Sequence, residues 1–279
     1  MRADASTHGY ATDVVERVLD ALLARVARRR RPLLAGISGL QGSGKSTLAS
    51  VLGVSARTRG VHCEVLTLDD FYFGRRGRLR LARMLHPLFA TRGVPGTHDL
   101  ALLQRTLAAL AMASPRRPAR VPRFDKGRDT RVAPSRWRTV TRPPGLIVLE
   151  GWCVGVPPQD VGALRRPVNA LERDEDRDRR WRGAVNAGLA GDYAQLWRRL
   201  DRLVLLQAPS FAVVGRWRDE QERSLRARGA PRALDHAALR RFLMHYERLS
   251  RHALRTLPAR ADIRLVLDAH RRVRAIEGA

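Results

Sequence analysis

Apolar residues recur along the chain with two spacings, one typical of helices and one typical of buried strands. Segment 13–30 places valine or leucine every three to four residues, which predicts an amphipathic helix. Further helices are expected at 45–57, 99–113, 211–228 and 236–257. Short uninterrupted apolar runs predict five buried strands, at 33–38, 61–68, 146–149, 203–206 and 263–267.

Three other segments show neither spacing clearly. Residues 74–97 are rich in arginine and glycine, and we expect a partly helical connection outside the core. Residues 114–144 contain six prolines, which predicts a loop with short extended pieces. Residues 172–182 mix charges of both signs, and this pattern favours a solvated helix face.

Short apolar strands that alternate with helices predict an α/β fold, a three-layer sandwich with a mainly five-stranded parallel sheet. We see no repeat and no linker, so residues 1–279 are expected to form one domain, with 1–30 as an N-terminal helical extension. Ligands of such sheets bind beyond the carboxyl ends of the strands. The residues that follow the first three strands should therefore meet at one edge.

A glycine-rich turn follows the first of these strands. The sequence GLQGSGKS at 39–46 fits the pattern G-x-x-x-x-G-K-[ST] between a strand and a helix, which indicates a phosphate loop rather than a structural glycine turn. Backbone N–H groups there would cradle phosphates, Lys45 would reach the β- and γ-phosphates, and Ser46 would ligate Mg²⁺. The candidate nucleotide-binding residues are Gly39, Gln41, Gly42, Ser43, Gly44, Lys45, Ser46 and Thr47.

Carboxylates follow the second and third strands. Asp69, with Asp70 beside it, is placed to orient an acceptor hydroxyl and take its proton, although a helix cap or turn is the alternative. Glu150 is placed to hold Mg²⁺ directly or through water, and its alternative is a surface acid at a strand end. A nucleoside triphosphate is implied, but these residues alone do not say what is done with it.

Composition narrows the class of protein. Hydrophobic residues make up 44% of the 279 residues and charged residues 29%, which excludes a disordered or fibrous chain. No apolar stretch approaches 18 residues and no signal-peptide core is seen, so we expect no membrane span. Two cysteines cannot form a disulfide framework, and a reducing cytoplasm is the simplest compartment.

The formal net charge of +26 has two interpretations, a nucleic-acid partner or a general bias toward arginine. All but two of the 53 basic residues are arginine, and they are spread over the whole chain. This distribution favours the bias and disfavours a nucleic-acid partner. The only two lysines are Lys45, in the phosphate loop, and Lys126. We interpret Lys126 as a contact to an acceptor anion or phosphate, or else as a surface residue.

Five segments together resemble one known family. GISGLQGSGKSTLA, TLDDFY, HPLFATRGVPGTHDL, RFDKG and IVLEGWCVG look like the P-loop small-molecule kinases of the D-glycerate 3-kinase type, which are similar to uridine kinase, phosphoribulokinase and bacterial pantothenate kinase. The resemblance covers about residues 33–268. It implies a P-loop NTPase-type fold with a helical lid, ATP and Mg²⁺ as cofactors, and a small hydroxyl acceptor as partner. A monomer or a homodimer is expected, and the sequence does not decide between them.

The resemblance also implies roles for particular residues. Lys45 and Asp69 become the catalytic candidates, and Ser46 and Glu150 the metal ligands. Segments 74–97 and 114–144 lie on the acceptor side, and 209–228 falls at the lid. Without the resemblance, His98 would be a loop histidine and Asp99 a helix cap. The substrate candidates are Asp70, Tyr72, His98, Asp99, Lys126 and Arg218.

Abundant cations and only 5% aromatic residues favour an anionic acceptor over a nucleobase. D-glycerate is therefore the leading candidate for the acceptor. An acceptor of the uridine or pantothenate type is the alternative. A P-loop NTPase that binds nucleic acid is the rival from another class of protein.

Overall fold

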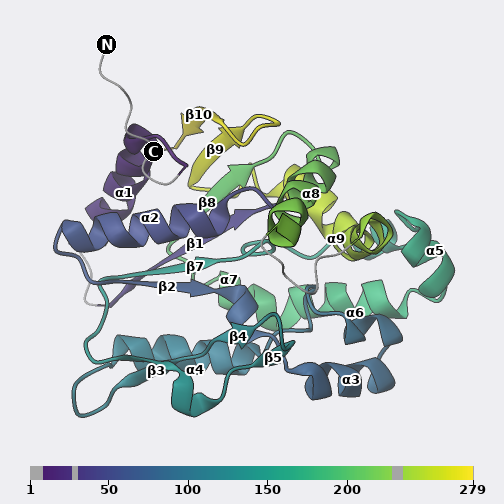
Figure 1. Cartoon of the computed structure of the whole chain (residues 1–279), viewed down its shortest axis with the longest axis horizontal. Coiled ribbons are helices and arrows are strands. Elements are labelled where there is room, and N and C mark those ends of the chain that lie inside the picture. Colours follow the sequence, from purple (N-terminus) through teal and green to yellow (C-terminus); the bar gives the residue numbers. More distant parts are fainter. Residues whose placement is uncertain (1–8, 27–30, 228–234, 279) are drawn as a thin grey trace.

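A computed structural model describes residues 9–26, 31–227 and 235–278 (Figure 1). Its centre is a six-stranded sheet in the order β10-β9-β8-β1-β7-β2. The five predicted strands are confirmed and run parallel, whereas the sixth strand, β10, pairs antiparallel with β9 at the sheet edge. The strands span β1 Leu33–Gly39, β2 Cys63–Thr67, β7 Leu146–Glu150, β8 Arg202–Gln207, β9 Ile263–Leu267 and β10 Val273–Glu277.

Strand β1 lies in the middle of the sheet and is buried along its whole length, as its apolar sequence predicts. Its register places Ile37 opposite Glu150 of β7, and β7 in turn places Glu150 opposite Thr67 of β2. The carboxyl ends of these three strands are therefore level. This register brings together the segments that follow the three strands, as the sequence predicts.

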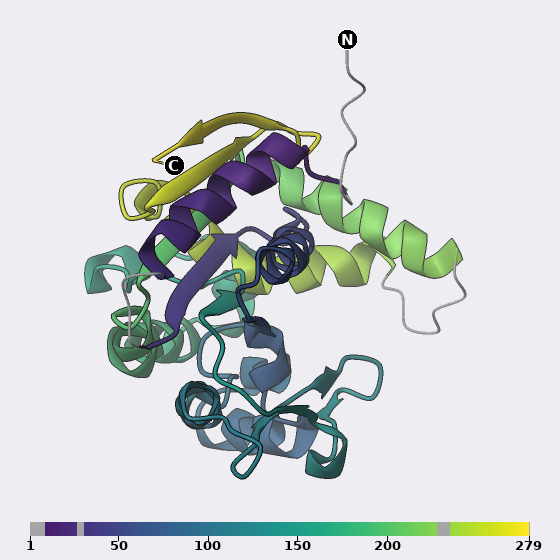
Figure 2. The same cartoon turned by 90° about the vertical axis from the view of Figure 1, so that its left-hand side faces the viewer.

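Helices cover both faces of the sheet, which confirms the three-layer α/β fold. On one face α1 (Thr12–Val26) and α2 (Lys45–Thr58) pack on the strands, and Figure 2 shows α1 beside the β9–β10 hairpin. On the other face lie α4 (Leu100–Ala111) and α6 (Arg180–Gly188). The remaining helices are α3 Arg75–Met84, α5 Ala170–Glu175, α7 Ala194–Trp197, α8 Ala212–Ala227 and α9 His236–Thr256.

The helices predicted at 45–57, 99–113 and 236–257 are confirmed to within two residues at each end. The last part of the helix predicted at 13–30, and residue 228 of the helix predicted at 211–228, lie outside the described residues. No helix in the described ranges combines the length and the apolar character that crossing a membrane requires.

Segment 114–144 forms the expected short extended pieces, paired as two small antiparallel ribbons. These are β3 (Ala119–Val121) with β6 (Arg138–Val140), and β4 (Phe124–Asp125) with β5 (Thr130–Arg131). Segment 74–97 contains the expected helix, α3, followed by a 3₁₀ turn at Pro87–Ala90. The expectation that 74–97 stays outside the core is wrong, because Leu88, Phe89 and Val94 are buried in it.

The expectation of a solvated face at 172–182 holds for residues 173–175 and 177–180, which are exposed, but not for the acids Glu172 and Asp176. Glu172 is fully buried and pairs with Arg248 of α9 at 2.6 Å, and Asp176 is fully buried and pairs with Arg182 at 2.7 Å. Charge alternation along the sequence does not show which charges are exposed. Here the opposite charges are buried as bonded pairs, which is how buried charges are usually accommodated.

Candidate active site

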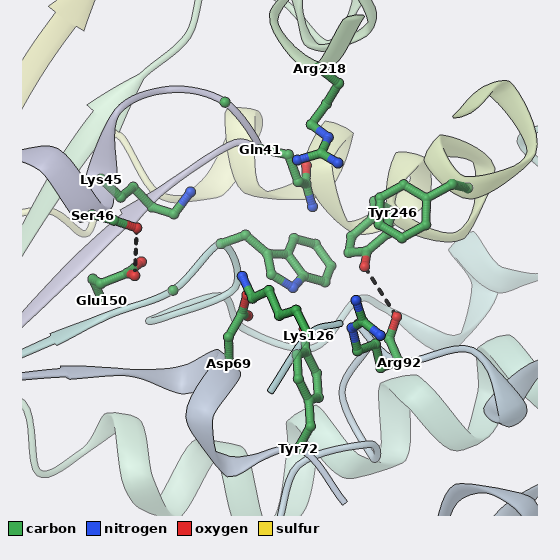
Figure 3. Close-up of a pocket in the computed structure, with 14 residues that line it drawn as sticks. Gln41, Lys45, Ser46, Asp69, Tyr72, Arg92, Lys126, Glu150, Arg218 and Tyr246 are labelled. Atoms are coloured by element: carbon green, nitrogen blue, oxygen red, sulfur yellow. Dashed lines mark hydrogen bonds and ion pairs between the residues drawn. The ribbon is translucent and has the colours of Figure 1, made fainter. Parts of the chain in front are cut away.

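A cavity of about 280 Å³ opens at the carboxyl edge of the sheet, where the segments after β1, β2 and β7 meet. It receives side chains from the phosphate loop, the turn after β2, the β4–β5 hairpin and helices α8 and α9 (Figure 3). The lining residues are Gln41, Gly42, Lys45, Ser46, Asp69, Tyr72, Arg92, Lys126, Glu150, Gly151, Trp152, Arg218, Phe242 and Tyr246.

The phosphate loop has the backbone that its glycines allow. Gly42 and Gly44 have φ of 79° and 94°, and a Cβ at these positions would lie 2.8 Å from Trp217 and 2.6 Å from the Tyr10 hydroxyl. Helix α2 begins at Lys45, and no side chain caps its first N–H groups. Uncapped N–H groups at a helix N-terminus, next to a glycine turn, suit the binding of an anion.

Lys45 is almost completely buried, and its Nζ donates to the Leu40 carbonyl at 3.0 Å. Burial lowers its pKa, and the neighbouring charges of Glu150 and Asp69 act in the opposite direction. An anionic ligand in the loop would favour the charged ammonium in the same way. The hydrogen bond to Leu40 thus holds the Lys45 ammonium group next to the phosphate loop.

Ser46 and Glu150 meet beneath the loop, where the Ser46 hydroxyl donates to Glu150 Oε1 at 2.7 Å. Glu150 is buried and stands at the last position of β7. A hydroxyl and a carboxylate oxygen are the hard oxygen ligands that Mg²⁺ prefers. This pair fits a Mg²⁺ ion beside the phosphate loop.

Asp69 lies in the 3₁₀ turn Leu68–Phe71 after β2, and its carboxylate accepts a hydrogen bond from Lys126 at 2.7 Å. Burial, the largest single effect, raises the pKa of the Asp69 carboxyl, but the charge and hydrogen bond of Lys126, together with smaller effects that include a hydrogen bond from Tyr72, bring the pKa below its ordinary value. The Lys126 side chain is 63% exposed, so the pair lies at the open side of the cavity. Two residues 57 positions apart thus share one site.

Three of the predicted substrate residues are not among those that line the cavity. Asp70 accepts from the Phe124 N–H at 2.8 Å, and burial raises its pKa. Asp99 caps α4 by accepting from Leu102 N–H and also pairs with Arg131. These contacts tie the β4–β5 hairpin and α4 to the cavity wall.

His98 is the third of them. Its ring stacks on Tyr72 at 4.4 Å between centroids, and its Nδ1 lies 2.6 Å from the Tyr193 hydroxyl. Burial lowers the pKa of His98 to about 4, so the imidazole is neutral at neutral pH. His98 therefore supports Tyr72, which itself lines the cavity.

The structure adds Arg92, Phe242 and Tyr246 to the residues that sequence reasoning placed at this site. Phe242 and Tyr246 stand four residues apart on α9, a spacing that also describes ordinary core residues. Arg92 lies in HPLFATRGVPGTHDL, one of the segments that carry the resemblance, but was not singled out there from the other residues. Arg218, which was predicted, reaches the cavity from α8 with its guanidinium carbon 5.7 Å from the Phe242 ring centre.

A second cavity, of about 450 Å³, adjoins the phosphate loop. Three predicted nucleotide-binding residues, Ser43, Gly44 and Thr47, line it. The rest of its wall comes from the two ends of the described chain, Gly9, Tyr10, Ala11, Val14, His270, Arg271, Arg272 and Val273. The phosphate loop therefore borders two cavities.

No protein-family model matches the sequence. The chain is 35% identical over 228 residues to a protein of Schizosaccharomyces pombe named uncharacterized kinase mug58, covering 77% of this chain and 79% of that protein. It is 31% identical over 206 residues to the chloroplastic D-glycerate 3-kinase of Arabidopsis thaliana, covering 71% of this chain but only 42% of that protein. In fold it is similar to a D-glycerate 3-kinase structure from Cryptococcus neoformans, with a TM-score of 0.77 and 22% identity over 95% of this chain and 98% of that one.

Proposed function

Because the chain belongs to the P-loop kinases related to D-glycerate 3-kinase, we propose that it transfers the γ-phosphoryl group of ATP to a hydroxyl group of D-glycerate. That the protein is a phosphotransferase acting on an alcohol follows from its kinase relatives. One observation supports the more specific proposal, the transfer of the phosphoryl group to a hydroxyl of D-glycerate. The Asp69–Lys126 pair, a carboxylate base with a cation bonded to it, lies in the same cavity as Lys45 and the Ser46–Glu150 pair.

The nucleotide would straddle the phosphate loop. Loop N–H groups and Lys45 would hold the β- and γ-phosphates, with the γ-phosphate facing the cavity that contains Asp69. The second cavity, between Tyr10, Thr47 and the turn at Arg271, would take the nucleoside. Ser46 and Glu150 would hold Mg²⁺, which neutralises charge on the phosphate oxygens when it is bound.

The transfer itself needs one proton acceptor. The acceptor hydroxyl oxygen attacks the γ-phosphorus and forms a new P–O bond, while the bond from phosphorus to the β–γ bridging oxygen breaks and its electron pair leaves with ADP. The hydroxyl proton passes to the Asp69 carboxylate. Because the pKa of Asp69 is lowered, its carboxylate is ionised and ready to accept this proton at neutral pH.

The charge of the cavity supports an anionic acceptor. Four cationic side chains line it but only two carboxylates do. Lys126 stands beside Asp69, where an acceptor would bind, and Arg218 reaches in from α8, within the segment expected to form the lid. Among the aromatic side chains in the wall, Tyr72 stacks on His98 and Trp152 packs edge-to-face against Tyr246.

A screen of acceptors tests this proposal. ADP release from Mg-ATP is measured with D-glycerate, glycerol, uridine and pantothenate, with Lys45→Ala as the inactive control. We expect release that depends on D-glycerate and is lost in Lys45→Ala. Release with uridine or pantothenate but not with D-glycerate would overturn the choice of acceptor. ATP hydrolysis stimulated by polynucleotides instead would favour the nucleic-acid NTPase.

A further inference from the structure

We propose that Arg92 is the residue that selects a carboxylate in the acceptor, an inference that rests on the proposed function. Arg92 lies at the far side of the cavity from Lys45 (Figure 3). A hydroxy acid bound with its carboxylate on Arg92 would present a hydroxyl group toward Asp69. The planar guanidinium of arginine matches a carboxylate with two parallel hydrogen bonds, which a lysine ammonium does not provide.

The backbone that carries Arg92 is fixed from three directions. The Tyr246 hydroxyl donates to the Arg92 carbonyl at 3.2 Å, Trp152 Nε1 donates to the Gly93 carbonyl at 2.9 Å, and Gly93 N–H donates to Thr97 Oγ1 at 3.2 Å. At Gly93 φ is 140°, and a Cβ there would lie 2.0 Å from the Tyr246 hydroxyl. Only glycine permits this close approach of α9 to the segment. Binding groups held this way lose little entropy when the ligand arrives.

The side chain of Arg92 is oriented by Asp129 on the β4–β5 hairpin, and its guanidinium carbon lies 5.7 Å from the Phe124 ring centre. Asp129 also pairs with Arg78, which is 2% exposed and donates to the carbonyls of Phe73 and Ala90. Two guanidinium groups thus share one carboxylate, which leaves one positive charge in excess.

That excess charge is available on Arg92 rather than on Arg78. The side chain of Arg92 is 30% exposed and lines the cavity. Within the described ranges, Asp129 is the sole hydrogen-bonding partner of its guanidinium, through Nη1. The other cations of this region are engaged differently, because Lys126 donates to Asp69 and Arg218 pairs with Glu222. Arg92 is therefore the cation best placed to take a carboxylate without disturbing the proposed base.

The test compares D-glycerate with glyceramide, which has the same hydroxyl groups but a neutral amide in place of the carboxylate. Arg92→Gln should raise the KM for D-glycerate at least about tenfold, the loss expected for a charge-assisted contact. Its kcat/KM for glyceramide and its KM for ATP should stay within about twofold of wild type, because neither involves the lost contact. Arg128→Gln, which removes an 80% exposed arginine next to Asp129 on the β4–β5 hairpin, is the control and should leave the kinetic constants for both substrates unchanged.

Each outcome separates this inference from the proposed function. Suppose the wild type phosphorylates D-glycerate. If Arg92→Gln then has an unchanged KM for D-glycerate, or loses equal factors of kcat/KM on both substrates, only the role proposed for Arg92 is overturned. Wild type that does not phosphorylate D-glycerate overturns both. If Arg92→Gln does not fold by circular dichroism, Arg92→Lys decides, because it keeps the charge without the planar fork. We expect Arg92→Lys to have a raised KM for D-glycerate, and an unchanged KM would contradict the anchor.

Discussion

Asp69 is the residue on which the proposed chemistry depends most directly. Asp69→Asn keeps the size of the side chain and removes the proton acceptor, so kcat should fall by about 10²- to 10⁴-fold. Nucleotide affinity should be largely kept, because Asp69 follows β2 and lies outside the phosphate loop. Steady-state rates and calorimetric ATP binding measure the two effects. Asp125→Asn, at an acid of the β4–β5 hairpin whose side chain is 39% exposed, is the control, and full kcat in Asp69→Asn would refute the base assignment.

Lys126 gives a second prediction at this scale, through pH. The ionised form of Asp69 is the base, so kcat/KM is lost as the pH falls through the pKa of Asp69. Lys126 lowers that pKa by its charge and hydrogen bond. Lys126→Met should therefore raise the pKa and move the acid limb of the pH–rate profile to higher pH, whatever its effect on the overall rate. Arg128→Met should leave the limb in place, and an unmoved limb in Lys126→Met would show that the pair does not control the base.

Single residues were predictable from the sequence where a motif or a strand end identified them. Lys45 and Ser46 came from the phosphate-loop pattern, Asp69 and Glu150 from their places after buried strands, and all four line one cavity. Arg92 lies in the segment 74–97 expected on the acceptor side, but nothing in the sequence distinguishes it from the other arginines of that segment. Its position depends on hydrogen bonds to Tyr246 and Trp152, which are distant in the sequence.

At the scale of elements, helices α5 and α9 are joined by two ion pairs that differ chiefly in burial. Glu172 and Arg248 are buried, whereas Glu175 and Arg241 are 39% and 54% exposed. Removing one partner of a buried pair leaves an uncompensated charge, so Glu172→Ala should lower the free energy of unfolding by about 3–5 kcal/mol. Glu175→Ala, the matched control, should cost about 0–1 kcal/mol. Urea unfolding measures both, and equal losses would contradict this account.

Elements with a strong pattern were predicted well, and those that depend on tertiary contacts were not. The five parallel strands are continuous apolar runs because both of their faces are covered. Strand β10 was missed because it is an edge strand, with Arg274 and Glu277 interrupting its apolar positions. The burial of Glu172 within the otherwise largely exposed segment 172–182 could not be predicted, because its partner Arg248 is on α9, 76 residues away.

At the scale of the whole molecule, the question is what the charge of +26 means. Arginines are distributed over many elements, and several pair with acids from distant segments, as Arg31 does with Asp201 and Arg59 with Glu16. This scatter fits a general preference for arginine. The cavity charge, in contrast, is local and suits phosphates and an anionic acceptor. The two aspects of the charge can be tested separately.

The most direct test follows the fate of the phosphoryl group by ³¹P NMR, in a mixture of the protein, Mg-ATP and D-glycerate. We expect the γ-phosphate signal to be replaced by that of a phosphate monoester as ADP forms, and we expect no reaction when D-glycerate is omitted. Inorganic phosphate as the main product, formed equally well without D-glycerate, would contradict the account.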